Sequence, residues 1–174
     1  MRFYSIALFS EAKPLIDGFN LKKSSDKLFG IYENTDTKLI ITGMGSINSS
    51  IATTYLLTKY DAKQEDFAFN LGLAGANFDC QIGDIFEVSK VIDYGSKSIL
   101  TLPLKGKKLT TFSSPVSRCD IKNTLVDMEG YGFLKSSKKF IKVENIMIKK
   151  VVSDFLDEKV LEKEEVYKLI KNLL

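Results

Sequence analysis

The chain has 174 residues, of which 44% are hydrophobic, a content typical of one folded domain with a substantial core. We therefore expect a single domain over residues 1–174. Charged residues make up 27% of the chain, the net charge is only +3, and the lysines are scattered, so we expect no nucleic-acid partner. No apolar run has the roughly 18 residues that a membrane span needs, and the N-terminus lacks a signal-peptide pattern, which predicts a cytoplasmic protein with no membrane partner.

The sequence contains no histidine, which narrows the chemistry. Without histidine there is no Ser-His-Asp triad, no Cys-His pair and none of the commonest zinc ligand. Cys80 and Cys119 lack metal-type spacing, and we expect them to be reduced and at least partly buried. Neither a metal nor a cofactor is predicted. Any acid or base must be a carboxylate, Lys, Tyr or Cys, which favours carboxylate chemistry with shifted pKa values.

The first part of the chain reads as strands followed by one helix. The apolar run at 2–8 predicts a strand that leads into a loop or helix start, with Glu11 near the carboxyl end of that strand. Runs at 28–32 and 39–42 predict a hairpin. Apolar residues at three-to-four spacing predict a helix over 46–60, which Ser46 would cap.

The rest of the chain alternates strands and helices, with no assignment over residues 94–124. We expect, in order, a strand at 67–71 that ends in a small-residue loop over 70–76, an extended stretch at 85–92, a helix at 125–140, a strand at 146–152 and a helix at 162–174. This alternation favours an α/β domain with a parallel or mixed central sheet. Ligands of such sheets bind at the carboxyl ends of the strands, where Glu11, the turn at 43–48 and Asp154 are expected to meet.

Two glycine-containing segments are candidate ligand contacts. The turn Gly43-Met44-Gly45-Ser46-Ile47-Asn48 would present backbone N–H groups at a helix start, although a purely structural turn explains it equally well. It does not complete a dinucleotide-binding fingerprint, because Asn48 stands where glycine is needed and the next strand reaches Asn70 without a carboxylate. The small residues at 70–76 would admit either a flat ligand or another element packed closely.

Two carboxylates stand out by their context. Gly130 and Gly132 interrupt the helix predicted at 125–140, each at a cost of about 1 kcal/mol, so another element or a ligand should approach closely beside Glu129. The alternative is a solvated glutamate on a helix packed through its glycines. Asp154 follows an apolar strand, where burial would raise its pKa and make it an acid near neutrality. The alternative is that Asp154 caps a helix that follows it.

Taken in order, these motifs resemble the nucleoside phosphorylase/nucleosidase superfamily (purine nucleoside phosphorylase family 1). The motifs are Glu11 after the first strand, Gly-Met-Gly-Ser-Ile-Asn, Asn-Leu-Gly-Leu-Ala-Gly-Ala, Gly-Asp-Ile-Phe-Glu-Val-Ser, Asp-Met-Glu-Gly and Val-Val-Ser-Asp. The resemblance is greatest to methylthioadenosine/S-adenosylhomocysteine nucleosidases and futalosine hydrolases. It implies a three-layer α/β/α sandwich with a central mixed, barrel-like sheet, a homodimer, and a purine nucleoside as the small-molecule partner.

The resemblance also implies roles for individual residues. Asp154 matches the acid that protonates N7 of the purine, and Glu11 matches the carboxylate that positions the attacking water. Met128 and Glu129 match the residues that pack under the ribose and hold its hydroxyls, and Lys150 falls where the family often has arginine. The further substrate-binding residues on this resemblance are Ser153, Gly72, Leu73 and Ala74.

The resemblance favours hydrolysis. Ser10-Glu11-Ala12 resembles the hydrolases rather than the Gly-Asp-Pro turn of the phosphorylases, and Leu73 stands where many members have serine. A phosphate-dependent phosphorylase and a catalytically weakened nucleoside-binding protein are the alternatives. The chain is shorter than typical members between Tyr94 and Phe112, and Val116 falls near the position of a base-stacking Phe. A pocket open on that side implies weakened activity or a wall supplied by a second subunit.

Overall fold

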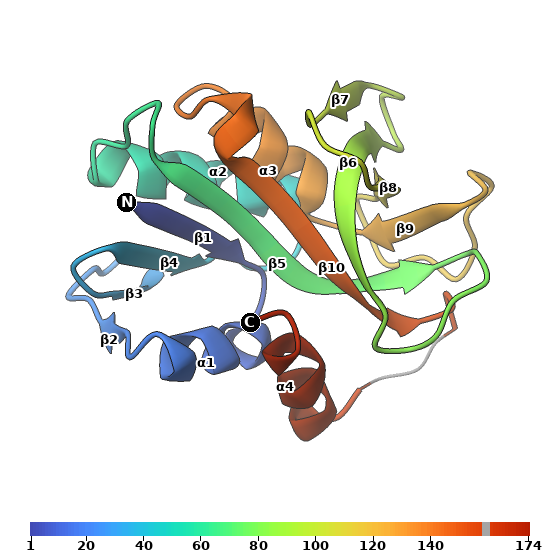
Figure 1. Ribbon diagram of the computed structural model, residues 1–174, viewed down its shortest axis with the longest axis horizontal. Helices are drawn as coiled ribbons and strands as arrows, with labels where there is room; N and C mark the ends of the chain where they lie inside the picture. The colour runs from blue at the N-terminus through green and yellow to red at the C-terminus, as the bar shows by residue number, and fades with distance from the viewer. Residues whose placement is uncertain (158–160) are drawn as a thin grey trace.

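A mixed β-sheet forms the centre of the protein, with helices on both of its faces (Figure 1). The computed structural model describes residues 1–157 and 161–174. In chain order the elements are β1 (Arg2–Ile6), α1 (Phe9–Gly18), β2 (Lys22–Lys23), β3 (Gly30–Glu33), β4 (Thr37–Ile41), α2 (Ser46–Lys59), β5 (Phe67–Ala76), β6 (Ile85–Asp93), β7 (Ile99–Thr101), β8 (Lys107–Thr111), β9 (Thr124–Asp127), α3 (Gly130–Ser137), the short 3-10 helix η1 (Val143–Asn145), β10 (Ile146–Asp154) and α4 (Lys163–Lys171). Within these described ranges no helix is both long and apolar enough to span a bilayer.

The sheet combines a parallel part with a closed, barrel-like part. Strands β4, β1, β5 and β10 run parallel in that order, so their carboxyl ends meet at one edge. β10 also pairs with β6, and from β6 the pairing continues through β8 and β9 back to the end of β5. This ring places the ends of β5, β9 and β10 next to one another.

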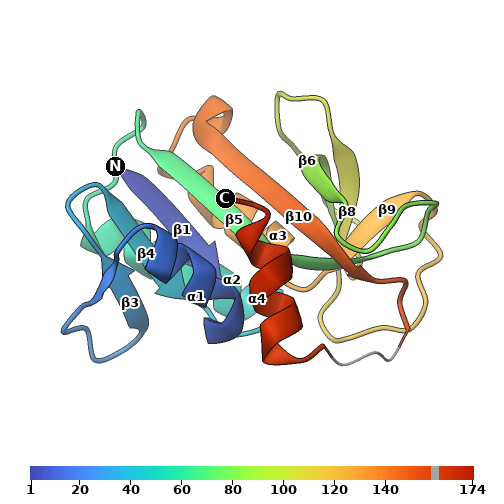
Figure 2. The same ribbon diagram turned by 60° about the horizontal axis from the view of Figure 1, so that its bottom comes forward.

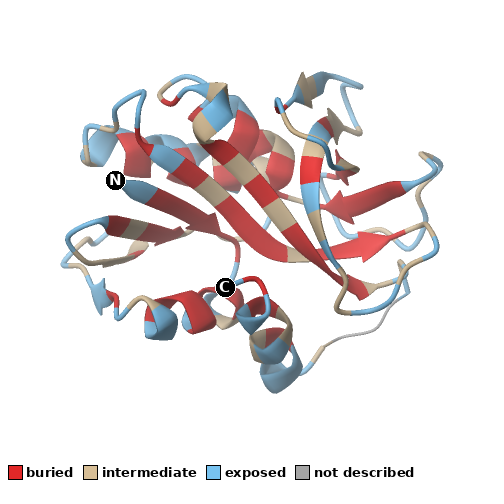
Figure 3. Ribbon diagram, in the orientation of Figure 1, coloured by how far each residue is buried: buried red, intermediate tan, exposed pale blue. Residues whose placement is uncertain are grey.

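The two faces of the sheet carry separate apolar clusters. Along β1, Phe3 packs in the cluster under α2 and α3, whereas Tyr4 packs in the cluster under α1 and α4. In β4, Ile40 and Leu39 divide between the two clusters in the same way, as the two-residue period of a strand requires. Figure 2 shows α1 and α4 together on the near face, and Figure 3 shows the central strands largely buried. The expected three-layer α/β/α sandwich with a central mixed sheet is confirmed.

Several predicted elements are confirmed with small shifts in their ends. The hairpin is β3 and β4, which pair antiparallel. The predicted helices at 46–60 and 162–174 are α2 and α4, and the stretches at 85–92 and 146–152 are β6 and β10. Ser46 is the first residue of α2 rather than its cap; Gly45 holds that position.

The small-residue loop predicted over 70–76 was wrong, because these residues continue β5 to Ala76. Glycine is a poor strand former, so the sequence reads as a loop. Here β10 pairs with β5 from Ala68 to Gly75, which satisfies the backbone along this length. The missing side chains at Gly72 and Gly75 make room for side chains from α1 and β10.

The helix predicted over 125–140 was wrong in its first residues. Thr124–Asp127 forms the buried strand β9, parallel to β8 and antiparallel to β5, and helix α3 begins only at Gly130. A four-residue buried strand shows no alternation of apolar and polar residues, so its pattern cannot be distinguished from one turn of a buried helix. The unassigned stretch at 94–124 contributes β8 to the ring, and β7, which pairs with β6 outside the ring.

Candidate functional site

A cavity of about 330 Å³ opens where the carboxyl ends of β1, β5 and β10 meet the loop after β9. Its walls come from six separate segments, which brings residues far apart in sequence to one place. The lining residues are Ala7, Leu8, Glu11, Met44, Leu73, Ala74, Gly75, Ser114, Pro115, Val116, Val126, Asp127, Met128, Glu129, Ser153, Asp154, Leu156 and Asp157. The mixture of apolar walls and convergent carboxylates is typical of a small-molecule site.

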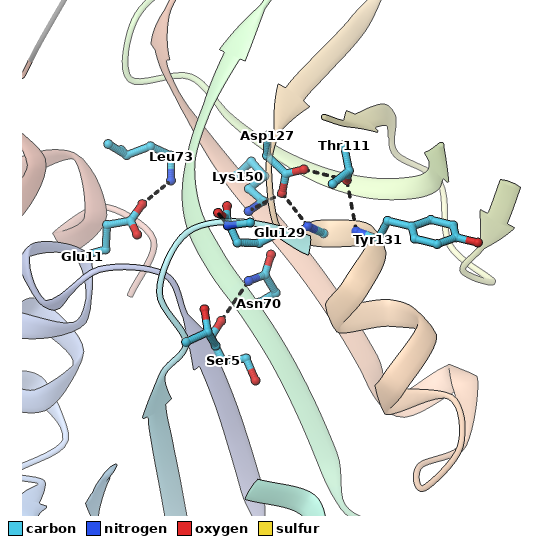
Figure 4. A network of polar contacts seen from close by, with 12 residues as sticks. Ser5, Glu11, Asn70, Leu73, Thr111, Asp127, Glu129, Tyr131 and Lys150 are labelled. Carbon is cyan, nitrogen blue, oxygen red and sulfur yellow. Dashed lines mark hydrogen bonds and ion pairs between the residues drawn. The ribbon is translucent and has the colours of Figure 1, made fainter. Parts of the chain in front are cut away.

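Glu11 is held in place by backbone N–H groups from two elements. It lies in the first turn of α1 and is only 6% exposed. Its Oε2 accepts from the N–H of Leu8 at 3.1 Å, and its Oε1 accepts from the N–H of Leu73 in β5 at 3.0 Å (Figure 4). Burial raises the pKa of Glu11 above its ordinary value, although these N–H groups oppose the change. The carboxylate therefore has a fixed position and an increased basicity.

Glu129 precedes α3 and turns back toward the start of α2. Its Oε1 accepts from the N–H of Gly45 at 2.8 Å, and within the described part of the chain nothing is found to donate to Oε2. Gly43 and Gly45 have φ values of 77° and 103°, which glycine adopts without strain, so this turn can aim its N–H at Glu129. Burial, followed by the nearby Asp127, raises the pKa of Glu129 to about 7.

A buried ion pair joins Asp127, which lines the cavity, to Lys150 behind the cavity wall. Lys150, in the middle of β10, is 1% exposed, and its Nζ lies 2.9 Å from Asp127 Oδ2. Asp127 also accepts from the Thr111 hydroxyl at 2.7 Å and from the N–H of Gly130 at 2.8 Å (Figure 4). Burial disfavours the ammonium of Lys150, but the surrounding carboxylates, Asp127 foremost, outweigh it and raise the pKa of Lys150.

Asp154 ends β10 and lines the same cavity. Ser153 Oγ donates to Asp154 Oδ2 at 2.6 Å and lies 3.2 Å from the carbonyl oxygen of Ala74. Asp154 Oδ1 accepts from the N–H of Leu156 at 2.9 Å. That bond closes a turn in which Leu156 has a φ of 61°, an unfavourable value for a residue with a bulky side chain. The described chain has no helix between Asp154 and Lys163, so Asp154 holds a turn here and caps no helix.

The residues named from the sequence divide into two groups. Glu11, Leu73, Ala74, Met128, Glu129, Ser153 and Asp154 line the cavity. Gly72 and Lys150 do not line it and lie behind its wall, where a Cβ on Gly72 would meet Glu11 Oε1 at 3.2 Å and Lys150 Nζ at 3.5 Å. The chemical roles of all these residues stay predictions.

One charged contributor was missed from the sequence. Asp127 lines the cavity and binds Lys150, and its signal was a carboxylate that directly follows the apolar pair Leu125-Val126. Met44 lines the cavity from the turn at 43–48, which the sequence had indicated as a candidate ligand contact. Among the described residues no group of three His, Cys, Asp or Glu side chains is placed to hold a metal ion. Cys80 and Cys119 are free and half-buried, as expected.

Comparison by sequence finds no relatives. No protein-family model matches the chain, and no curated protein matches it.

Comparison by structure matches the chain to solved structures of nucleosidases. The 5′-methylthioadenosine/S-adenosylhomocysteine nucleosidase of Helicobacter pylori, solved with butyl-thio-DADMe-Immucillin-A, superimposes with a TM-score of 0.79 over 99% of this chain and 95% of its own, at 16% identity. Futalosine hydrolase of the same organism superimposes with a TM-score of 0.78 over 98% of this chain and 92% of its own, at 16% identity. The 5′-methylthioadenosine nucleosidase of Arabidopsis thaliana superimposes with a TM-score of 0.77 over 98% of this chain and 88% of its own, at 20% identity. The chain therefore has the fold of these nucleosidases.

Proposed function

We propose that the protein is a purine nucleosidase that hydrolyses the N-glycosidic bond of a nucleoside such as methylthioadenosine, S-adenosylhomocysteine or futalosine. The observation that carries the proposal is that Glu11, Glu129 and Asp154 line one cavity, in a fold shared with a 5′-methylthioadenosine/S-adenosylhomocysteine nucleosidase and a futalosine hydrolase. Cleavage of this bond passes through an oxocarbenium-like state, which needs an acid at the leaving base and negative charge around the sugar.

Asp154 is proposed as the acid to the base. Asp154 lines the same cavity as Glu11, and Ser153 beside it donates a hydrogen bond that fixes the carboxyl group. To reach a purine N7, Asp154 Oδ1 would release the N–H of Leu156. The left-handed backbone of Leu156 favours that release, because opening the turn relieves its strain.

Glu11 is proposed to position the attacking water, and Glu129 is proposed to bind the ribose hydroxyls. Two backbone N–H groups anchor Glu11 without neutralising it, as suits a group that orients and activates water. Glu129 Oε2 would accept from ribose hydroxyls, with Met128 packing beside the sugar. Leu73 and Ala74 would form the floor of the cavity, and Gly72 leaves room for the Glu11 carboxylate.

The test is to incubate the protein with methylthioadenosine, S-adenosylhomocysteine, futalosine and inosine, each with and without phosphate, and to measure free base. We expect release of free base without phosphate, and release only with phosphate would identify a phosphorylase instead.

Asp154→Asn and Glu129→Gln should each lower kcat/KM by about 10²-fold or more. Asp61→Asn is the control, because Asp61 is an exposed acid on another surface. If the protein only binds nucleosides, calorimetry would show nucleoside binding, and neither the wild type nor any variant would release free base.

We also propose that the protein is a homodimer whose second copy covers the open side of the cavity. Met44 is 54% exposed and lines the cavity, and Ile47 and Ile51 continue the apolar surface along α2 at 76% and 56% exposure. Exposed apolar side chains gathered next to a binding cavity are typical of an interface. A localisation in the cytoplasm stays a prediction.

A further inference from the structure

Four charged side chains meet at the base of the cavity, but just two of these four form an ion pair. Glu11 comes from α1, Asp127 from the end of β9, Glu129 from the start of α3 and Lys150 from β10. Asp127 alone among the described carboxylates lies within 4.0 Å of Lys150 Nζ. The one cation of the cluster is thus bound to the carboxylate that has no proposed part in the reaction.

Lys150 nevertheless lies within reach of Glu11. A Cβ built on Gly72 would meet Glu11 Oε1 at 3.2 Å and Lys150 Nζ at 3.5 Å, so the two groups approach the same point. No side chain separates them there, because residue 72 is glycine. A lysine side chain has enough rotatable bonds to cross such a gap.

Asp127 is itself fixed on both oxygens. Oδ1 accepts from Thr111 Oγ1 at 2.7 Å, and Oδ2 accepts from the N–H of Gly130 at 2.8 Å in addition to Lys150. Thr111 Oγ1 in turn accepts from the N–H of Tyr131 at 3.0 Å. The carboxylate is therefore tied to β8 and to the first turn of α3, and it can hold the ammonium in a defined place.

We propose that Asp127 is a positioning residue that holds the Lys150 ammonium away from Glu11 and Glu129. On the proposed function, on which this inference rests, Glu11 and Glu129 then keep their free electron pairs for water and ribose. Gly72 allows the close approach, and the Asp127 anchor prevents the approach from becoming an ion pair.

The physical reason is the cost of an unpaired charge in the interior. Removing one partner of a buried pair leaves a charge that must find another partner. Without Asp127, the carboxylates that act on Lys150 are Glu11 from α1 and Glu129 from the start of α3. An ion pair with Lys150 would lower the pKa of Glu11 and occupy one of its oxygens.

The decisive experiment compares Asp127→Asn with the double variant Asp127→Asn/Lys150→Met. We expect Asp127→Asn to lower kcat by about 10²-fold, the typical contribution of an acid or base, with a smaller change in KM. Removing the lysine as well frees Glu11, so the double variant should recover at least about 10-fold of that loss. If Asp127 only supported the fold, kcat per folded molecule, with the folded fraction measured by urea unfolding, would be unchanged in Asp127→Asn, and the proposal would be overturned.

A second measurement does not depend on catalysis. The pKa of Glu11 is followed by carbon-13 NMR of labelled glutamate carboxyls, with the signal assigned by Glu11→Gln. It should fall in Asp127→Asn and return toward the wild-type value in the double variant. Asp26→Asn is the matched control, since Asp26 also binds a lysine, Lys59 at 3.1 Å, but on another part of the molecule. An unchanged Glu11 pKa in Asp127→Asn would refute the inference, whereas a wild type that releases no base would refute only the proposed function.

Discussion

Glu129 lies among groups that oppose its ionisation. The side chain is 8% exposed, and burial together with Asp127 raises its pKa to about 7, while Lys150 and the N–H of Gly45 only partly compensate. Near neutrality this carboxyl group is therefore divided between its two protonation states. A ligand hydroxyl that donates to Glu129 favours the ionised form, so binding would release a proton there.

We predict that Glu129 makes the protein less stable as pH rises from its ordinary pKa near 4.5 to about 7. Over this range the native carboxyl keeps a proton that the unfolded one has lost, and the free energy of unfolding must fall as pH increases. The slope should not exceed ~1.4 kcal/mol per pH unit. Urea unfolding at several pH values measures it. Glu129→Gln should flatten the slope and the exposed control Glu144→Gln should not; equal slopes in all three proteins would contradict the prediction.

At the scale of elements, the contact between α2 and α3 holds the Glu129 side of the cavity together. Gly132 in the first turn of α3 lies against Ser46 at the start of α2, so closely that a Cβ there would be 1.9 Å from the carbonyl oxygen of Ser46. The same approach brings the N–H of Gly45 to Glu129. The expectation that another element approaches these glycines closely is confirmed. Glycine lowers the helix propensity of this segment, but a larger residue at position 132 would prevent α3 from packing against α2.

We predict that Gly132→Ala destabilises the protein by about 1–3 kcal/mol, the usual range for overpacking, because backbone atoms cannot yield as a flexible side chain can. It should also raise KM, because α3 carries Glu129. Gly95→Ala is the matched control, since its new Cβ would meet only Asp93 Oδ2 at 3.8 Å. The urea midpoint and KM of both variants are compared with the wild type. If Gly132→Ala were as stable as Gly95→Ala, the close contact would not matter for the fold.

For the whole molecule, the exposed apolar side chains at the start of α2 lie next to the cavity in sequence and share Met44 with it. Met44 belongs to both, and the neighbouring cavity of about 390 Å³ between the starts of α2 and α3 also includes Ile47. A second copy seated on this surface would cover exposed apolar side chains and narrow the entrance to the site.

We predict a dimer in solution, measured by light scattering after gel filtration. Ile47→Glu should shift the mass to that of a single chain, because a charge would be buried in the interface, and it should raise KM through the exposed cavity. Leu28→Glu is the control, since Leu28 is equally exposed, 75% against 76%, but lies before β3. A wild type with the mass of one chain, or a dimer unaffected by Ile47→Glu, would count against the proposed interface.

The sequence by itself determined the elements whose patterns are local. The helices at α2 and α4, the hairpin of β3 and β4, and strand β10 follow from apolar spacing that a short segment carries alone. The order of motifs was also enough to predict the layered fold. Glu11, Glu129 and Asp154 could be named because each stands beside a strand end or beside unusual glycines.

Only the tertiary structure decided the path of β5, the strand β9 and the pairing of the charges. Gly72 and Gly75 lie in a strand because β10 pairs along β5 and because neighbouring side chains occupy the space that their own would fill. Lys150 binds Asp127 rather than Glu11 because Thr111 and Gly130 fix Asp127 at that place. Contacts between residues far apart in the chain depend on how the layers assemble, and no local pattern records them.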